Sequence, residues 1–263
     1  MPSGAARCDQ VGTCDCYSGN MKRPLIIAHR GASFAAPENT AAAFQLASAM
    51  GADGFECDVR LSRDLVAVVI HDADLKRLAG VKKAVGDLSL VELKALDIGR
   101  WFSRKYAGQH ILTLEETLAL SRKNFSALVE VKAGGPNDEQ LAIATARLLA
   151  RTRFARACSF SPTICATIRK NAPDVAVDLV CSPASNAKWA AALLVAHKMR
   201  LAGLAVNHRH LSQARVTKVH ELGLSVGAWT VNHAATVAKL ARWGVDAIET
   251  DKPDMALRAL LKA

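Results

Sequence analysis

The feature that most constrains the fold is a regular alternation that begins at Pro24. Short runs of β-branched and other apolar residues alternate with longer segments whose apolar residues recur at helical spacing. This pattern is typical of a parallel α/β protein, because a crossover helix must precede each new parallel strand. The expected strands are 25–29, 54–60, 66–71, 127–132, 157–160, 176–181, 203–206, 224–230 and 246–250. The expected helices are 38–50, 114–123, 138–151, 162–171, 185–199, 211–222, 233–242 and 253–262.

The strand count favours one particular α/β architecture. Residues 61–65 are too few for a crossover helix, so 54–60 and 66–71 should form an antiparallel hairpin. Removing one hairpin arm leaves eight parallel strands and predicts a (β/α)8 TIM barrel. A doubly wound sheet is less favoured, since no glycine-rich dinucleotide loop follows the first strand. The long connection at about 73–113 predicts a small insertion over one end of the barrel.

The length of 263 residues accommodates one barrel, which we expect over residues 22–263, after a flexible N-terminal extension at 1–21. A hydrophobic content of 51% with 22% charged residues excludes disordered, collagen-like and coiled-coil chains. The chain has no run of about 18 apolar residues and no secretory signal pattern, so we expect a cytoplasmic protein without stable membrane insertion. Cys8, Cys14 and Cys16 lie in the extension, where no fourth ligand follows at zinc-site spacing.

Acidic side chains gather where the expected strands end, which is where a barrel carries its functional groups. Glu56 and Asp58 project from the same face of one strand, and Glu130 lies near the end of another. Three carboxylates at one barrel mouth repel each other unless a cation joins them, and hard oxygen ligands suit Mg2+ or Ca2+ better than zinc. The sequence therefore predicts a divalent metal site. The alternative is that Glu56 or Asp58 simply pairs with Arg60 or Lys132.

Two histidines, His29 and His71, stand at expected strand ends beside other charged residues. Because imidazoles titrate near neutrality, such a pair can share the general base and general acid duties of one reaction. Arg30 and Lys132 supply positive charges that suit phosphate oxygens. This combination indicates phosphoester cleavage. Acyl transfer is less favoured because the Gly-x-Ser-x-Gly nucleophile motif is absent, and a glycosidase does not require the histidines.

The motifs that carry these residues, in this order and spacing, resemble the glycerophosphodiester phosphodiesterase family in its bacterial cytoplasmic form. They are His29-Arg30-Gly31, Pro37-Glu38-Asn39-Thr40, Glu56-Cys57-Asp58-Val59, Val68 to Asp72, Glu130-Val131-Lys132, Ser159-Phe160, Trp229 to Asn232 and Gly244 to Pro253. The resemblance implies a barrel with an insertion after the His-Asp motif and the following roles: His29 and His71 as acid/base pair, Glu56, Asp58 and Glu130 as ligands of Mg2+ or Ca2+, and Arg30 and Lys132 as phosphate contacts. The segment 73–78 is less threonine-rich than the family pattern, which leaves substrate preference open.

The expected activity is metal-dependent hydrolysis of a small-molecule glycerophosphodiester to glycerol 3-phosphate and an alcohol. Phe160 and Trp229 are candidates for an apolar wall against the glycerol carbons, with ordinary packing at the barrel top as the alternative. A second hypothesis is a phospholipase D-like or cyclising activity on lysophospholipids, which needs an apolar patch on the insertion. A third is nucleic-acid binding, suggested by the formal charge of +10 but opposed by scattered basic residues and the lack of a recognised nucleic-acid module. The oligomeric state stays open.

Overall fold

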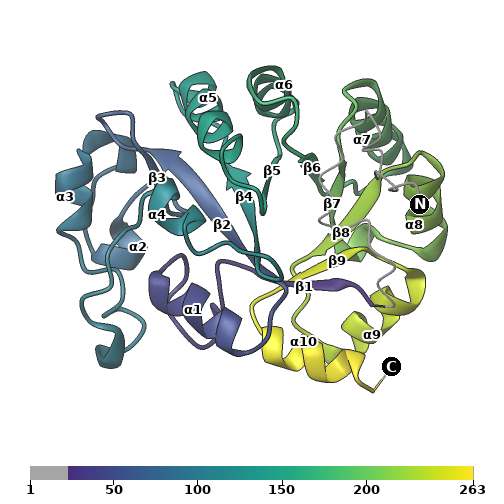
Figure 1. The fold of residues 1–263 in the computed structure, drawn as a ribbon, viewed down its shortest axis with the longest axis horizontal. Helices are drawn as coiled ribbons and strands as arrows, with labels where there is room; N and C mark the ends of the chain where they lie inside the picture. Colours follow the sequence, from purple (N-terminus) through teal and green to yellow (C-terminus); the bar gives the residue numbers. More distant parts are fainter. Residues whose placement is uncertain (1–22, 263) are drawn as a thin grey trace, which may run out of the picture.

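The computed structural model describes residues 23–262, so the predicted extension at 1–21 lies outside the described residues. Eight parallel strands close into a barrel with helices around it, which confirms the predicted TIM barrel (Figure 1). Around the barrel the strands follow the order β1, β9, β8, β7, β6, β5, β4, β2, and β2 pairs back with β1. Their bounds are β1 Leu25–Ala28, β2 Gly54–Leu61, β4 Ser126–Val131, β5 Ala155–Ser159, β6 Val177–Cys181, β7 Gly203–Asn207, β8 Ser225–Trp229 and β9 Ala247–Thr250.

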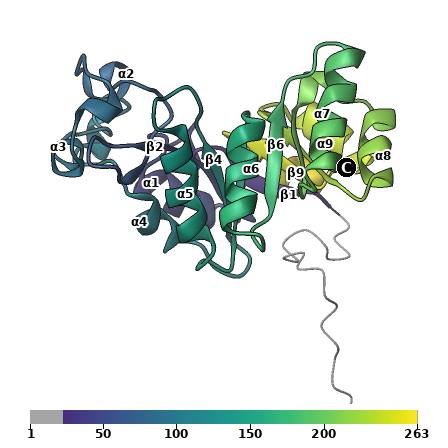
Figure 2. The same ribbon diagram turned by 90° about the horizontal axis from the view of Figure 1, so that it is seen from above.

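The remaining strand, β3 (Ala67–Val69), pairs antiparallel with the end of β2, as the short connection predicts. The insertion follows it and carries α2 (Lys76–Ala79), α3 (Leu90–Lys94) and two 3-10 turns, which lie to the left in both ribbon views (Figures 1 and 2). A small apolar core holds this segment on β3 and the residue after it. That core comprises Val68, Ile70, Leu75, Leu78, Val85, Leu88, Leu93, Ile98 and Ile111.

Helices separate the barrel strands along the chain. They are α1 (Ala41–Ala49), α4 (Leu114–Leu118), α5 (Asp138–Leu149), α6 (Pro162–Asn171), α7 (Asn186–Lys198), α8 (Gln213–Glu221), α9 (Ala234–Trp243) and α10 (Pro253–Leu260). No helix among residues 23–262 has the length and apolar character needed to cross a membrane.

Two predicted helix boundaries are wrong by three residues or more. The first helix begins at Ala41 instead of residue 38, because the Thr40 hydroxyl accepts the N–H of Ala43 and thereby caps the helix. Helix α4 ends at Leu118 instead of residue 123, since Arg122 and Phe125 exchange backbone hydrogen bonds in a tight antiparallel bridge. In both places a local hydrogen bond outweighs the helical spacing of the apolar residues.

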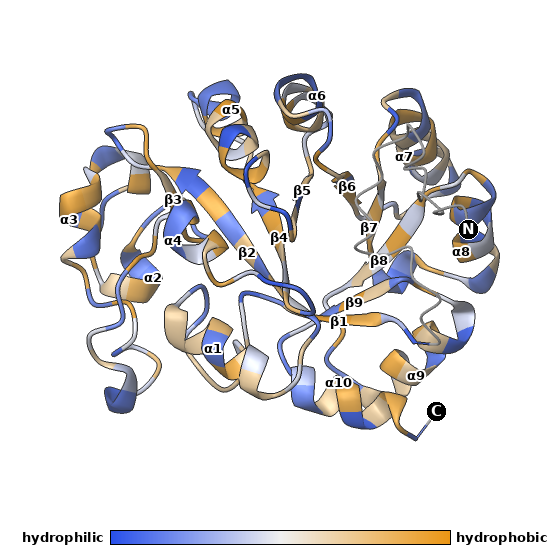
Figure 3. Cartoon of the chain, in the orientation of Figure 1, coloured by the Kyte–Doolittle hydropathy of each residue, from blue (hydrophilic) through white to orange (hydrophobic). Residues whose placement is uncertain are grey.

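Side chains along each strand alternate between the barrel interior and the layer of helices. The outward-facing residues join the helices in one large core, which includes Ile26, Phe55, Val129 and Ile248. The inward-facing residues form a smaller cluster with Ile27, Leu128, Cys158, Val180 and Ala205. Figure 3 shows this alternation as hydrophilic and hydrophobic bands along β2. The polar bands matter for function because they face the barrel interior.

The lower part of the interior, near the amino ends of the strands, contains an ion pair. Arg156 on β5 binds Asp178 on β6, and both side chains are buried. Gly203 on β7 leaves room for Ser225 and Asp178, because a Cβ at that position would meet Ser225 Oγ at 2.2 Å and Asp178 Oδ1 at 3.0 Å. The charged groups at this end are thus enclosed by the barrel itself.

Candidate functional site

A cavity of about 170 Å³ opens at the other end of the barrel, where the strands have their carboxyl ends. Seven of the nine predicted site residues line it: His29, Arg30, His71, Glu130, Lys132, Phe160 and Trp229. The other two, Glu56 and Asp58, lie close by on β2, with carboxylate oxygens within 4.8 Å of a Glu130 oxygen. The structure therefore brings the predicted residues into one site, although they come from distant parts of the chain.

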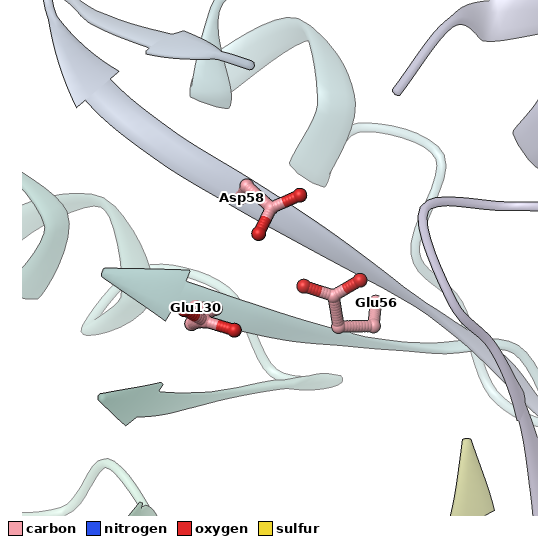
Figure 4. A group of neighbouring side chains, drawn as sticks. All are labelled: Glu56, Asp58 and Glu130. Carbon is pink, nitrogen blue, oxygen red and sulfur yellow. The ribbon is translucent and has the colours of Figure 1, made fainter. Parts of the chain in front are cut away.

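The three carboxylates form a buried cluster. Glu56 and Asp58 project from β2, and Glu130 projects from the neighbouring strand β4 toward them (Figure 4). Glu56 is 1% exposed, and its Oε1 has no hydrogen-bond partner among the described residues. Burial and the nearby charges of Asp58 and Glu130 raise the pKa of Glu56 well above its ordinary value. A divalent cation would relieve this repulsion and use the free oxygen, so the donor set fits a metal with oxygen ligands.

Asp58 differs from Glu56 because it is surrounded by donors. Asn39 Nδ2 donates to Asp58 Oδ2 at 2.8 Å, Arg30 Nε lies 3.2 Å from the same oxygen, and Lys132 Nζ lies 2.7 Å from Oδ1. Burial alone would raise the pKa of Asp58, but Lys132 and Arg30 hold it at about 2. This carboxylate is therefore ionised at neutral pH.

The predicted alternative, in which the acids pair with nearby cations, holds for one cation. Lys132 Nζ contacts both Asp58 and Glu130, the latter at 2.5 Å. Arg60 forms no ion pair with either acid in the described part of the chain. Lys132 and Arg30 supply two positive charges against three carboxylates, so the cluster keeps an excess of negative charge.

His29 is held by a carboxylate at the end of β9. Its Nδ1 lies 2.7 Å from Asp251 Oδ1, and Asp251 also accepts hydrogen bonds from Ser33 Oγ and Asn232 Nδ2. Burial opposes the charge of Asp251, but the His29 contact lowers its pKa below the ordinary value. An ionised Asp251 favours the proton on Nδ1 and leaves Nε2 as the basic nitrogen of His29.

His71 is held in a similar way, but its support extends into the insertion. His71 Nδ1 lies 2.9 Å from Asp72 Oδ1, and Arg77 of α2 donates from Nε to Asp72 Oδ2 at 2.7 Å. The same guanidinium donates twice to Glu38, at 2.7 and 2.8 Å, and Glu38 accepts a further bond from Arg30 at 3.0 Å. Arg77 thus connects the support of His71 with that of Arg30.

The turn after β1 is under backbone strain. Arg30 has a φ of 56°, an unusual value for a residue with a side chain, and Gly31 follows with a φ of 81°. A Cβ on Gly31 would lie 2.6 Å from the carbonyl carbon of Ala43, so glycine is required here. The turn directs the backbone N–H of Arg30 to Glu56 Oε2 at 2.9 Å. The strained turn therefore fixes the position of a carboxylate in the cluster.

Two aromatic side chains form one wall of the cavity. Phe160 and Trp229 pack edge to face with ring centroids 5.5 Å apart, and Trp229 Nε1 donates to the carbonyl of Ala205 at 2.9 Å. Phe160 remains 48% exposed, so this aromatic pair faces the cavity rather than filling the core. Such a wall suits the carbon skeleton of a small ligand.

The sequence reasoning gave no role to several residues of this site. Glu249 on β9 lines the cavity at 7% exposure, and burial together with neighbouring carboxylates raises its pKa to about 8. Glu249 points inward because it lies two residues after Ala247, which faces the barrel interior. This spacing was visible in the sequence. Glu38 and Asn39 stand in the motif Pro37-Glu38-Asn39-Thr40, but the sequence does not show that they contact Arg77 and Asp58.

Comparisons with known proteins show which proteins this chain resembles. A model described as the glycerophosphoryl diester phosphodiesterase family matches residues 29–255. The protein YhdW of Bacillus subtilis is 35% identical over 236 residues, which cover 89% of this chain and 96% of YhdW. A glycerophosphodiester phosphodiesterase of Caldanaerobacter subterraneus is 32% identical over 244 residues, covering 91% and 99% of the two chains. The structure of an Oleispira antarctica phosphodiesterase with its product sn-glycerol-3-phosphate superposes with a TM-score of 0.83 at 28% identity, covering 90% and 97%.

Proposed function

This chain belongs to the glycerophosphoryl diester phosphodiesterase family, and on that premise we propose that it converts small glycerophosphodiesters to glycerol 3-phosphate and an alcohol in a metal-dependent reaction. One observation carries the proposal: two histidines, two cations and a carboxylate cluster meet at a single small cavity. The product bound by the Oleispira antarctica phosphodiesterase is the one that we expect here.

The histidines supply the proton transfers. One of the pair His29 and His71 accepts the proton of the attacking oxygen, and the other protonates the departing alkoxide, which is a poor leaving group at neutral pH. Each imidazole is oriented by its own carboxylate, Asp251 for His29 and Asp72 for His71. Each carboxylate also stabilises the imidazolium that forms during the reaction.

The cations and the aromatic wall position the diester. Arg30 and Lys132 line the cavity, and their charges suit the non-bridging oxygens of a phosphodiester. Phe160 and Trp229 cover the glycerol carbons and restrict water at that side. Holding the phosphorus between the two histidines makes the displacement effectively intramolecular.

Glu56, Asp58 and Glu130 would hold the metal, Mg2+ or Ca2+. When bound, such an ion polarises phosphate oxygens and makes a nearby hydroxyl or water more acidic. The three carboxylates together carry more negative charge than Arg30 and Lys132 balance, which favours a cation among them.

A glycerol 3-phosphate release assay tests the proposal. His29→Ala and His71→Ala should each lower kcat by a factor of about 10² to 10⁴, the usual contribution of general acid-base catalysis. His220→Ala is the matched control, because His220 pairs with Asp246 and lies outside the cavity lining. Near-normal turnover in both active-site variants, or full activity in chelator without added Mg2+ or Ca2+, would contradict the proposal.

The structure gives no support to the lysophospholipid alternative. It requires an apolar patch on the insertion, but Leu88 and Leu93 are buried in the insertion's own core. These two side chains are therefore unavailable to an acyl chain, and the exposed insertion residues Val91 (80%) and Trp101 (42%) do not line the cavity that holds the histidines.

A further inference from the structure

The cavity that is lined by His29 and His71 is called the mouth cavity below. A second, larger cavity adjoins it and takes no part in the chemistry described above. It measures about 340 Å³ and forms a groove between the insertion and the connection that leads from β4 to α5. The insertion side comprises Ala73 and residues 84–87, the opposite side comprises residues 134–138, and Leu61 and Leu141 add apolar surface. Lys132 lines both the groove and the mouth cavity, so the two spaces share this residue.

The strand geometry places a second cation in the groove. Glu56, Asp58 and Arg60 alternate along β2, so all three share the face that points into the barrel. Arg60 is the outermost of the three and lines the groove. Its Nε donates to the backbone carbonyl of His71 at 2.8 Å, which fixes the guanidinium directly behind a proposed catalytic histidine.

The charge of Arg60 has no dedicated counterion among the described residues. The carboxylates close enough to influence it are Asp58, Asp72, Glu130 and Asp138. Each of them is engaged elsewhere: Asp58 and Glu130 by Lys132, Asp72 by Arg77, and Asp138 by the N–H groups of Gly134 and Gly135. A half-buried guanidinium in this position is best stabilised by an anionic ligand.

The other charged groups of the groove are already engaged. Arg63 is largely exposed, and its guanidinium donates to Glu92 and to the Asp87 carbonyl. Asp87 accepts the N–H of Ala84 at 3.0 Å. A cationic ligand would therefore compete with existing hydrogen bonds, whereas an anionic ligand would find the outer edge of Arg60 available.

We propose that this groove receives the alcohol part of the diester, and that Arg60 favours head groups that carry a negative charge of their own, a carboxylate or a phosphate. This inference rests on the proposed function. A phosphodiester held at Lys132 has two substituents, and the two cavities that share this residue can each take one. The glycerol part lies against Phe160 and Trp229, so the leaving alcohol extends toward Arg60.

Two matched substrate pairs test the proposal. The first compares glycerophosphoglycerol with the glycerol 3-phosphate ester of glyceric acid, which differs by a carboxylate in place of a hydroxymethyl group. The second compares glycerophosphoinositol with its 4-phosphate. We expect kcat/KM to be about tenfold higher for the charged member, the size of one charge-assisted contact. A preference in only one pair supports the proposal for that anion alone.

Arg60→Met should bring the ratio within each pair close to one. Because Arg60 also supports His71, the variant lowers kcat for all substrates, but damage to His71 affects both members of a pair equally and leaves their ratio unchanged. Arg63→Met is the control and should keep the wild-type ratio, since it removes the same charge from an exposed, paired side chain.

The outcomes separate the two proposals. A wild-type ratio near one in both pairs, a preference that survives in Arg60→Met, or an equal loss of preference in Arg63→Met would overturn the role of Arg60. Failure to release glycerol 3-phosphate from any of the diesters would instead overturn the proposed function.

Discussion

Both ends of the barrel interior contain buried charge, but the charges are balanced at one end and unbalanced at the other. Near the amino ends of the strands, Arg156 and Asp178 form an ion pair, and Gly203 leaves room beside the Asp178 carboxylate. At the carboxyl ends, three carboxylates face two cations beside a cavity, and one oxygen of Glu56 has no partner among the described residues.

This difference teaches how to distinguish structural from functional charge. An enclosed ion pair of one cation and one anion carries no excess charge, although removing one partner is costly. An excess of like charges beside a cavity is unfavourable until a ligand arrives, so the fold must stabilise it by other means. We therefore expect substitutions at the lower pair to change stability, and substitutions at the mouth to change binding and turnover.

The largest expected change in the free energy of unfolding is at the ion pair of Arg156 and Asp178. Asp178→Ala leaves Arg156 buried without its main counterion, so the free energy of unfolding should fall by about 3–5 kcal/mol. Urea unfolding measures this loss, and activity per folded molecule should stay near the wild-type value. The double variant Arg156→Met with Asp178→Leu should recover most of the stability, because an apolar pair avoids the cost of burying charge. A stable Asp178→Ala protein would show that the barrel does not depend on this pair.

The next largest change in the free energy of unfolding is expected from metal binding at the carboxylate cluster. Mg2+ or Ca2+ at 100 times its dissociation constant should raise the free energy of unfolding by about 2.7 kcal/mol, because the ion binds only the folded cluster. Thermal unfolding with and without the ion measures the gain. Glu56→Gln should lose this gain without losing stability in chelator, whereas Asp178→Ala should keep the gain. Equal stabilisation of wild type and Glu56→Gln would remove Glu56 from the metal site.

The same contrast explains how far sequence alone could reach. The barrel was predictable because strand and helix patterns alternate along the chain and, once the hairpin is set aside, leave eight parallel strands. The histidines and the carboxylate cluster were predictable because they lie at the carboxyl ends of strands, which a barrel brings together. Helix α4 was predicted too long, since its end depends on a bridge between Arg122 and Phe125.

The supporting contacts could not be predicted for a different reason. Asn39 binds Asp58 from 19 residues away, and Glu38 binds Arg77 from 39 residues away. Polar residues of these types have many solvated conformations, and only the folded chain selects the one that makes the contact. Glu249 is the exception, because alternation along β9 was enough to place it at the cavity.

Glu249 allows the comparison between the two ends of the barrel to be tested through the pH dependence of stability. Its pKa is about 8 in the folded protein against an ordinary value of 4.5, so the unfolded chain releases this proton at lower pH. Stability without metal should therefore decline as the pH rises from about 5 to 8, by at most about 1.4 kcal/mol per pH unit from this group. Glu249→Gln should flatten the decline in urea unfolding measured in chelator. Glu221→Gln, an exposed control paired with Lys218, should retain the wild-type slope, and equal slopes in all three proteins would contradict the prediction.

The smallest effect that we expect comes from Arg77, which positions catalytic groups without touching the cavity. Arg77→Met removes the donor that holds the pKa of Asp72 at about 2 and also breaks the bridge to Glu38. We expect kcat/KM to fall about tenfold, or about 1.4 kcal/mol in transition-state stabilisation. The acid limb of the pH-rate profile should move to higher pH, because Asp72 then protonates more easily and releases His71.

Arg77→Lys should recover only part of this activity, since one ammonium cannot donate to Asp72 and Glu38 in the fork geometry of a guanidinium. The control is Arg100→Met, an exposed arginine of the same insertion that pairs with Asp97. If Arg77 only stabilises the insertion, Arg77→Met lowers the midpoint of unfolding but leaves the acid limb where it was. A shifted acid limb of the pH-rate profile at unchanged stability would instead establish that the insertion acts on His71 through the charge of Arg77. The Arg156–Asp178 pair at the other end of the barrel should have no such effect on the pH-rate profile.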